Sequence, residues 1–360
     1  MSDALNNAPT ADASPSAGWV GIIANPASAR DVRRVVGHAG SLTLSDRANL
    51  LFRLLAALGA CGIREARMMP DREGLQATMT RMLSRRSDFP LPRLSWLAME
   101  PRSTVNDTFQ AARLMRASAA SAILVLGGDG THRAVARECG AVPIAGISTG
   151  TNNAWPEPRE STIVGLAIGL YVSGKVPPAR ALRWNKWLDV SINANRPDAR
   201  RDIAIVDAAI LAERLVGSRS IWHTDRLSQL YLSFAEPHAV GLSAIGGLLM
   251  PVARDEPGGL KLTFGPGGTV VNAPVAPGVL RPIPVARWRP IAGGAADSPL
   301  LRRGVIALDG ERELLFGPQD KVQVSLREQA FRAIDVNACL HYAAANALLR
   351  DAAGDKGSPL

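Results

Sequence analysis

The sequence contains very little cysteine and no clear metal-binding pattern. Its 360 residues include only 3 cysteines, Cys61, Cys139 and Cys339, which lie far apart and form no CxxC pair. The 5 histidines are also scattered, without the spacing of metal ligands. These absences exclude a disulfide framework and a cysteine zinc site, and they fit a reducing cytoplasm. No metal ligand can be assigned from the sequence.

Long apolar segments are absent as well. The longest apolar run, residues 163–172, is too short to span a bilayer. Residues 1–18 are polar and rich in small residues, without the basic start and apolar core of a signal peptide, so we expect a disordered lead there. We therefore expect a soluble, cytoplasmic protein without a membrane span, and a homo-oligomer is left open.

Lysine is scarce among the basic residues, because only 5 of the 41 lysines and arginines are lysine. The arginines are scattered along the chain rather than gathered in runs, although the net charge is +9. Scattered charge does not favour nucleic acid as a partner. It fits an anionic small-molecule substrate or, more simply, a solvated basic surface.

The residues that are present predict two differently built regions. Hydrophobic residues make up 47% of the chain, enough to bury a proper core. In the first region, strand and helix signals alternate, which predicts a doubly wound parallel sheet. The strands are expected at residues 19–24, 63–68, 94–99, 121–126 and 142–147, and the helices at residues 44–58, 75–85, 104–117 and 131–139.

The second region begins with one more expected helix, and strand signals then replace helix signals beyond residue 186. This pattern predicts a mostly antiparallel β domain, in which residues 202–211 form a single strand. The predicted fold class is therefore α/β, with an N-terminal doubly wound parallel sheet domain and a C-terminal all-β domain. The expected divisions are a disordered lead at 1–18, an α/β nucleotide-binding domain at 19–160, the β domain at 161–336, and a C-terminal helix at 337–352 that packs back on the first domain.

The segment VLGGDGTHRAVA, residues 125–136, joins a predicted buried strand to a predicted helix through Gly127, Gly128, Asp129, Gly130 and Thr131. Glycines let backbone N–H groups approach phosphate oxygens, and the helix N-terminus adds a positive dipole. A carboxylate would repel phosphate, so Asp129 fits a magnesium partner or the acceptor of a substrate hydroxyl proton. A tight Asp-Gly turn without a ligand is the alternative.

Two further loops follow predicted parallel strands, and their carboxyl ends should meet at the same sheet edge. In residues 22–35, Asn25 and Ser28 could contact phosphate, and nearby arginines could neutralise it. Residues 146–156 offer short polar groups suited to ribose or polyol hydroxyls, namely Thr149, Gly150, Thr151, Asn152 and Asn153. Each loop alone also fits an ordinary turn. Their convergence favours a site for phosphate and hydroxyl groups.

The motifs NPAS, GGDGT and STGTNN together resemble the superfamily of NAD kinases and diacylglycerol-type lipid kinases. With the segments AERLVGSRSIW and GLSAIGG, the chain is similar to the acetoin-catabolism protein X branch of that superfamily. The resemblance implies an α/β domain, an all-β domain and a cleft between them that holds ATP, or another phosphoryl donor, and an acceptor. It also implies that Asp129 is the central catalytic carboxylate.

The second region adds further candidates through the same resemblance. Residues 306–316 resemble the Asp-Gly-Glu hairpin of the superfamily, which implies that Asp309 and Glu311 face the cleft; a plain hairpin turn is the alternative. NAD kinases usually carry an Asn-Glu pair for the dinucleotide, where this chain has VDAAILAERLVGSR, with Asp207 and Glu213 as substitutes.

The leading hypothesis is a Mg²⁺-dependent kinase that transfers a phosphoryl group from ATP to a hydroxyl of NAD or a related small molecule, in the manner of NADP biosynthesis, with a link to acetoin catabolism. A lipid or polyol kinase on the same scaffold is one alternative. A nucleotide-binding accessory protein without catalysis is the other.

Overall fold

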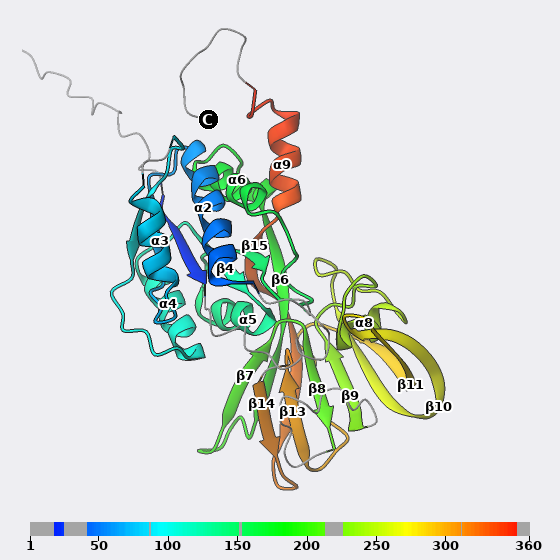
Figure 1. Cartoon of the computed structure of the whole chain (residues 1–360). Coiled ribbons are helices and arrows are strands. Elements are labelled where there is room, and N and C mark those ends of the chain that lie inside the picture. Colours follow the sequence, from blue (N-terminus) through cyan, green and yellow to red (C-terminus); the bar gives the residue numbers. More distant parts are fainter. Residues whose placement is uncertain are drawn as a thin grey trace, which may run out of the picture.

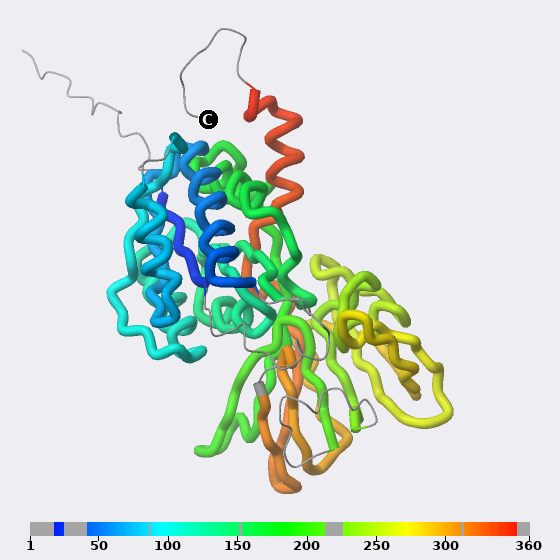
Figure 2. The backbone as a smooth tube through the Cα atoms, viewed as in Figure 1, coloured from blue at the N-terminus to red at the C-terminus, as the bar shows by residue number. Residues whose placement is uncertain are grey.

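Two β-sheets organise the chain. The computed structural model describes residues 18–24, 42–85, 88–150, 153–212, 226–310 and 312–350. Within these ranges the strands form a nine-stranded sheet flanked by helices and a six-stranded sheet (Figure 1). The backbone trace in Figure 2 shows the same arrangement, with the helical region above and the later strands below.

One end of the nine-stranded sheet is parallel, which confirms the predicted fold class. Its strands follow the order β3-β2-β1-β4-β5. β1 and β4 read VGIIA and AILVLG and are buried along their whole length, as expected of central strands covered on both faces. The bounds are β1 Val20–Ala24, β2 Glu65–Met68, β3 Arg93–Trp96, β4 Ala122–Gly127 and β5 Ile144–Ser148.

Helices cover both faces of this parallel part. α2, α3, α6 and α9 share one hydrophobic core with one face of the sheet, and α4 and α5 share a second core with the other face. α2 and α4 each start with a threonine and an aspartate that bond each other's backbone N–H groups, a reciprocal cap. The bounds are α2 Leu44–Ala60, α3 Leu75–Leu83, α4 Val105–Ala117, α5 Asp129–Glu138, α6 Ser161–Val172, α7 Pro178–Ala181 and α9 Val336–Ala345.

The nine-stranded sheet continues into strands that the sequence placed in the β domain. β15 (Val322–Ile334) pairs in parallel with β5, and β6 (Leu182–Ile192) and β7 (Arg200–Ala204) follow it in antiparallel pairs. The short β12 (Ala296–Asp297) pairs with β15. One sheet therefore runs through both regions, because β15 returns to the edge of β5, where Ala333 pairs with Ile144.

The expectation of one strand over residues 202–211 is wrong. The chain leaves β7 at Ala204, turns, and enters the second sheet as β8 (Asp207–Leu211). Both halves are apolar and buried, so their composition resembles a single strand. The break comes from the turn itself, because three successive backbone N–H groups, those of Ile205, Val206 and Asp207, bond one distant carboxylate.

The second sheet is antiparallel throughout and follows the order β11-β10-β9-β8-β13-β14. The short helix α8 (Leu242–Gly247) covers one face, and the other face packs against β6, β7 and β15 of the first sheet. The strands not yet given are β9 Leu227–Leu232, β10 Gly259–Ala276, β11 Val279–Ile291, β13 Gly304–Leu308 and β14 Arg312–Phe316. The sequence did not indicate β9 or β11.

The last helix, α9, packs against α6 and α7 and places Cys339 and Ala343 in the first core. Among the described helices, none has both the length and the apolar character needed to cross a bilayer.

The crossing of α2 and α6 depends on a glycine of α6. A Cβ atom at Gly165 would lie 2.7 Å from the carbonyl oxygen of Leu54. We expect Gly165→Val to lower the free energy of unfolding by about 2–3 kcal/mol, because α2 must move away. Urea unfolding measures this. Ile163→Val, at an exposed position of the same helix, is the control and should cost less than about 0.5 kcal/mol; an equal loss in both variants would contradict the packing account.

Candidate active site

The glycine turn lies where β4 ends and α5 begins. Gly127 is the last residue of β4, Gly128 is the N-cap of α5, and no side chain bonds the cap position. A Cβ atom at Gly128 would lie 2.8 Å from Oδ1 of Asn153, and one at Gly127 would lie 2.6 Å from Cβ of Thr131. Both positions require glycine because the next loop and the first helical turn approach so closely. Gly128 thereby leaves room for the side chain of Asn153, and Gly127 for that of Thr131.

Asp129 is the first residue of α5, and its carboxylate bonds the loop after β5. Its Oδ2 accepts a hydrogen bond from the backbone N–H of Ala154 at 2.9 Å, and its Oδ1 accepts one from that of Trp155 at 2.8 Å. The residue is only 9% exposed. These two bonds make Asp129 the anchor of the loop.

The same loop is held from its other side by Arg254. The guanidinium donates hydrogen bonds to the carbonyl oxygens of Trp155, at 2.9 Å, and Ala154, at 3.4 Å. Glu236 holds the guanidinium in a bidentate pair at 2.9 and 2.6 Å, and Arg254 also lies over the ring of Phe234. Burial raises the pKa of the Glu236 carboxyl, but the bonds and charge of Arg254 outweigh it and keep that pKa below its usual value.

The other predicted groups of this loop lie beside the turn. The backbone N–H of Thr149 donates to the carbonyl oxygen of Gly127 at 3.3 Å, and Nδ2 of Asn153 donates to Oγ of Ser148 at 2.8 Å. Gly150 follows Thr149, and its carbonyl oxygen accepts a bond from Oγ of Ser148. The structure thus brings these groups together with Asp129. The remaining predicted residues of the loops lie outside the described residues, namely Asn25, Ser28, Thr151, Asn152, Glu213 and Glu311.

Asp309 does not face an open cleft, so this expectation is corrected. It lies in the turn between β13 and β14 with a positive φ of 49°. Its carboxylate is fully buried and accepts the N–H groups of the turn at residues 205–207, and Nε of Arg133 lies 3.6 Å from Oδ2. Burial raises the pKa of Asp309, although the charge of Arg133 and these hydrogen bonds act to lower it. Asp207 is part of the same turn, since its carbonyl oxygen accepts the N–H of Asp309.

Arg133 was not indicated by any local pattern, yet it joins the two sheets. It lies one helical turn after Asp129 on α5, is buried, and approaches Asp202 of β7 at 3.5 Å as well as Asp309. Arg137, one turn further, bonds Asp202 at 3.0 Å. The helix that starts at the glycine turn is thus fixed by charge to the strands of the second region.

His132 is a buried histidine of the helix face rather than a phosphate ligand. Its Nδ1 lies 2.8 Å from the carbonyl oxygen of Gly128, and its ring packs beside that of Trp155 at 5.0 Å between centroids. A Cβ atom at Gly146 would lie 2.7 Å from Nε2. Burial lowers the pKa of His132 to about 4, despite backbone hydrogen bonds that act in the opposite direction.

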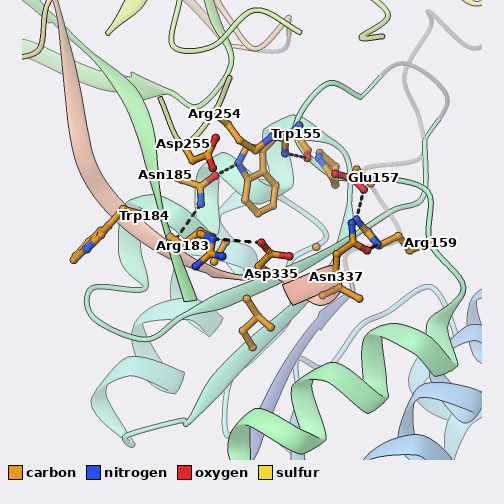
Figure 3. A pocket seen from close by; sticks show the side chains of 15 residues that line it. Trp155, Glu157, Arg159, Arg183, Trp184, Asn185, Arg254, Asp255, Asp335 and Asn337 are labelled. Atoms are coloured by element: carbon orange, nitrogen blue, oxygen red, sulfur yellow. Dashed lines mark hydrogen bonds and ion pairs between the residues drawn. The ribbon is translucent and has the colours of Figure 1, made fainter. Parts of the chain in front are cut away.

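A cavity of about 260 Å³ opens beside this site (Figure 3). It lies between the loop after β5, the start of β6 and the junction of β15 with α9. Trp155 forms one wall, and its Nε1 donates to Oδ1 of Asn185 at 3.1 Å. Arg183 approaches Asp335 at 3.4 Å, and Arg159 bonds Asn337 at 2.8 Å. Trp155 therefore links the cavity to Asp129, because its indole forms a wall of the cavity and its backbone N–H bonds the Asp129 carboxylate.

A buried lysine holds the loop that contributes Arg254 and Asp255 to the cavity. Nζ of Lys186 donates to the carbonyl oxygens of Ala253, Glu256 and Gly258 at 2.6–2.9 Å, which fixes the loop that carries Arg254. Burial lowers the pKa of Lys186 to about 8, although nearby carboxylates act to raise it. In the part of the chain that the structure describes, no three His, Cys, Asp or Glu side chains are grouped to hold a metal ion.

The titration of His132 should make stability depend on pH. Its pKa is about 4 when folded against 6.5 for the free side chain, so the unfolded state takes up the proton first as the pH falls. Stability should be complete above pH 6.5 and decrease by up to about 3 kcal/mol as the pH approaches 4. Urea unfolding across this window measures the slope. His132→Gln lacks the titrating group, so its free energy of unfolding should decrease less as the pH falls. An identical slope in both proteins would contradict the assignment.

The Arg254–Glu236 pair should be strongly coupled. Arg254→Gln and Glu236→Gln should each cost about 2 kcal/mol in the free energy of unfolding, because each leaves a largely buried charge without its partner. The double variant should cost less than the sum. The exposed pair Arg72–Glu100, changed in the same way, should show coupling below about 0.5 kcal/mol. Additive losses at residues 236 and 254 would show that the pair does not act as a unit.

The chain is similar to two protein families and to several solved structures. The ATP-NAD kinase N-terminal domain family matches residues 20–174. The acetoin catabolism protein X C-terminal domain family matches residues 186–329. Among solved structures, a diacylglycerol kinase from Bacillus anthracis is 13% identical, with a TM-score of 0.42, over 89% of this chain and 98% of that chain. Yeast NADH kinase complexed with NADH is also 13% identical, with a TM-score of 0.46, over 95% of this chain and 89% of that chain.

A curated relative shows the family. The acetoin catabolism protein X of Cupriavidus necator is 54% identical over 336 residues, which cover 92% of this chain and 94% of that protein. With this identity along both regions, and with an NAD kinase-like domain at its N-terminal side, the chain belongs to the acetoin catabolism protein X family.

Proposed function

We propose that the protein is an ATP-dependent phosphotransferase that phosphorylates a hydroxyl of NAD or a related small molecule, in a pathway linked to acetoin catabolism. The observation that carries this proposal is the glycine-capped start of α5 at the carboxyl end of β4, with Asp129 as its first residue. This arrangement combines an anion site with a carboxylate at one position. The NAD kinase-like match over residues 20–174 supports the same reaction class.

The phosphates of the donor would lie at Gly127, Gly128, Gly130 and Thr131. Backbone N–H groups at a helix N-terminus bind phosphate well, and a glycine cap allows close approach. β1 ends at Ala24, opposite Leu126 of β4, and Asn25 is the next residue in the sequence. We therefore assign Asn25 and Ser28 to the donor as well.

Asp129 would bind the acceptor hydroxyl from the first position of α5. In this role it orients the hydroxyl and accepts its proton as the phosphoryl group is transferred. Magnesium typically binds through one or two carboxylates together with phosphate oxygens, so Asp129 and the donor phosphates suit it without a three-carboxylate group. Bound there, the ion would neutralise charge on the transferred group.

The acceptor would occupy the cavity beside Trp155. Its wall combines an indole, the amides of Asn185 and Asn337, and paired charges such as Arg183 and Asp335. Such a lining suits a small polar and partly aromatic compound. Thr149, Gly150, Thr151, Asn152 and Asn153 would bind its hydroxyl groups. Asp207 and Glu311 remain proposed acceptor contacts from the second region.

A second function, nucleotide binding without phosphoryl transfer, has one specific observation in its favour. Both oxygens of Asp129 already accept backbone N–H groups, and the residue is nearly buried. A carboxylate used only to anchor a loop would need no more than these bonds. The two functions differ in whether a phosphorylated product forms.

The deciding experiment follows ADP release and product mass with purified protein, ATP, Mg²⁺ and a panel of acceptors that includes NAD. We expect a phosphorylated product, and we expect Asp129→Asn to lower its rate 10²- to 10⁴-fold while ATP binding persists. Asp88→Asn, an exposed control, should leave the rate unchanged. Tight ATP binding without any product supports the second function, whereas unchanged turnover in Asp129→Asn removes the proposed role of that residue.

A further inference from the structure

The hairpin of β10 and β11 extends beyond its neighbouring strand. β9 pairs only with residues 260–263 of β10, whereas β10 and β11 stay paired from Gly259 and Ile291 to Ala276 and Val279, next to the turn. Figure 1 shows this ribbon at the margin of the molecule, with α8 as the helix beside it. β11 is the terminal strand of its sheet. Most of the hairpin is therefore a two-stranded ribbon, a form that needs packing on at least one face.

The two faces of the ribbon differ. Val271, Ile283 and Val285 point to one face and join the core under α8. The alternating residues point to the opposite face, where Val270 pairs with Pro284 and Pro274 pairs with Leu280. On that face Val270 is 57% and Leu280 68% exposed. We call Val270, Leu280, Pro282, Pro284 and Arg287 the outer face of the hairpin.

The charge of the hairpin has one sign. Residues 259–291 contain no Asp or Glu and four basic residues, Lys261, Arg281, Arg287 and Arg289. Lys261 and Arg289 bond Asp297 of β12. Arg287 pairs in register with Thr263, on the face turned away from the core that contains Leu262. Arg287 is therefore a basic residue of the outer face, three residues along β11 from Pro284.

Prolines make the free edge unsuitable for another strand. β11 has Pro282, Pro284 and Pro290, which carry no N–H group to donate to an added strand. Prolines at an edge protect a sheet from pairing with a further chain. A second copy of this chain would also bring the same positive charge to the contact. The exposed part of the hairpin thus favours an anionic partner that is bound by side chains rather than by strand pairing.

We propose that the outer face docks on the surface of an anionic lipid bilayer. Val270 and Leu280 would enter the headgroup boundary, and Arg287 would pair with lipid phosphates, a combination of apolar burial and charge that suits such a surface. Nucleic acid fits less well, because the exposed residues of this face are mostly aliphatic and proline, with Asn272 as an amide among them and no aromatic side chain. The proposal does not depend on the enzymatic activity.

Vesicle co-sedimentation tests the proposal with the full-length protein. Vesicles of equal parts phosphatidylglycerol and phosphatidylcholine are compared with pure phosphatidylcholine. We expect binding only to the anionic vesicles, with an affinity that falls as salt is raised. Leu280→Ser combined with Arg287→Gln should weaken binding at least tenfold, since one surface arginine alone accounts for roughly fivefold.

The matched control is Leu300→Ser combined with Arg303→Gln. Leu300 is also 68% exposed, and the control changes the net charge equally at a site outside the hairpin. The control should bind vesicles like the unchanged protein. Equal loss in both variants would show a general charge effect and overturn the proposal. Binding to a single-stranded oligonucleotide but not to anionic vesicles, or to neither, would overturn it as well.

Discussion

The two hydrogen bonds from Ala154 and Trp155 to the Asp129 carboxylate are the interaction on which the site depends. They join the start of α5 to the loop after the neighbouring strand. Arg254 bonds the carbonyl groups of the same two residues from the other side. A short stretch of backbone is thus held at both its N–H and its C=O groups, so the wall of the cavity and the glycine turn have a fixed relation to each other.

A second set of charges transmits this arrangement to the rest of the protein. Arg133 and Arg137 extend from α5 to Asp202 and Asp309, and Asp309 in turn shapes the turn by which the chain passes from one sheet to the other. Removing one charge from such a buried group leaves its partners uncompensated. The helix that begins at the candidate site is therefore also the element that fixes the second sheet.

Local pattern was sufficient for the parallel sheet and for the glycine turn, because a buried run followed by Gly-Gly-Asp-Gly has few other structural solutions. It was not sufficient where residues far apart in the sequence determine the local structure. The break at Ile205 and Val206 depends on Asp309, a hundred residues later, and an unbroken apolar run conceals it. Arg254 is one of many scattered arginines, and only the folded chain shows that it meets Glu236 and Trp155. The role expected for Asp309 was wrong for the same reason, because a hairpin motif alone does not indicate that distant residues bury its carboxylate.

Amide hydrogen exchange of Ala154 and Trp155 tests the central claim most directly. If Asp129 anchors this loop, both N–H groups should be protected in the unliganded protein. Replacing Asp129 by alanine should speed their exchange at least about tenfold while the amides of β4 keep their protection. Rapid exchange of both amides in the unchanged protein, or exchange that is indifferent to the loss of the carboxylate, would contradict the account.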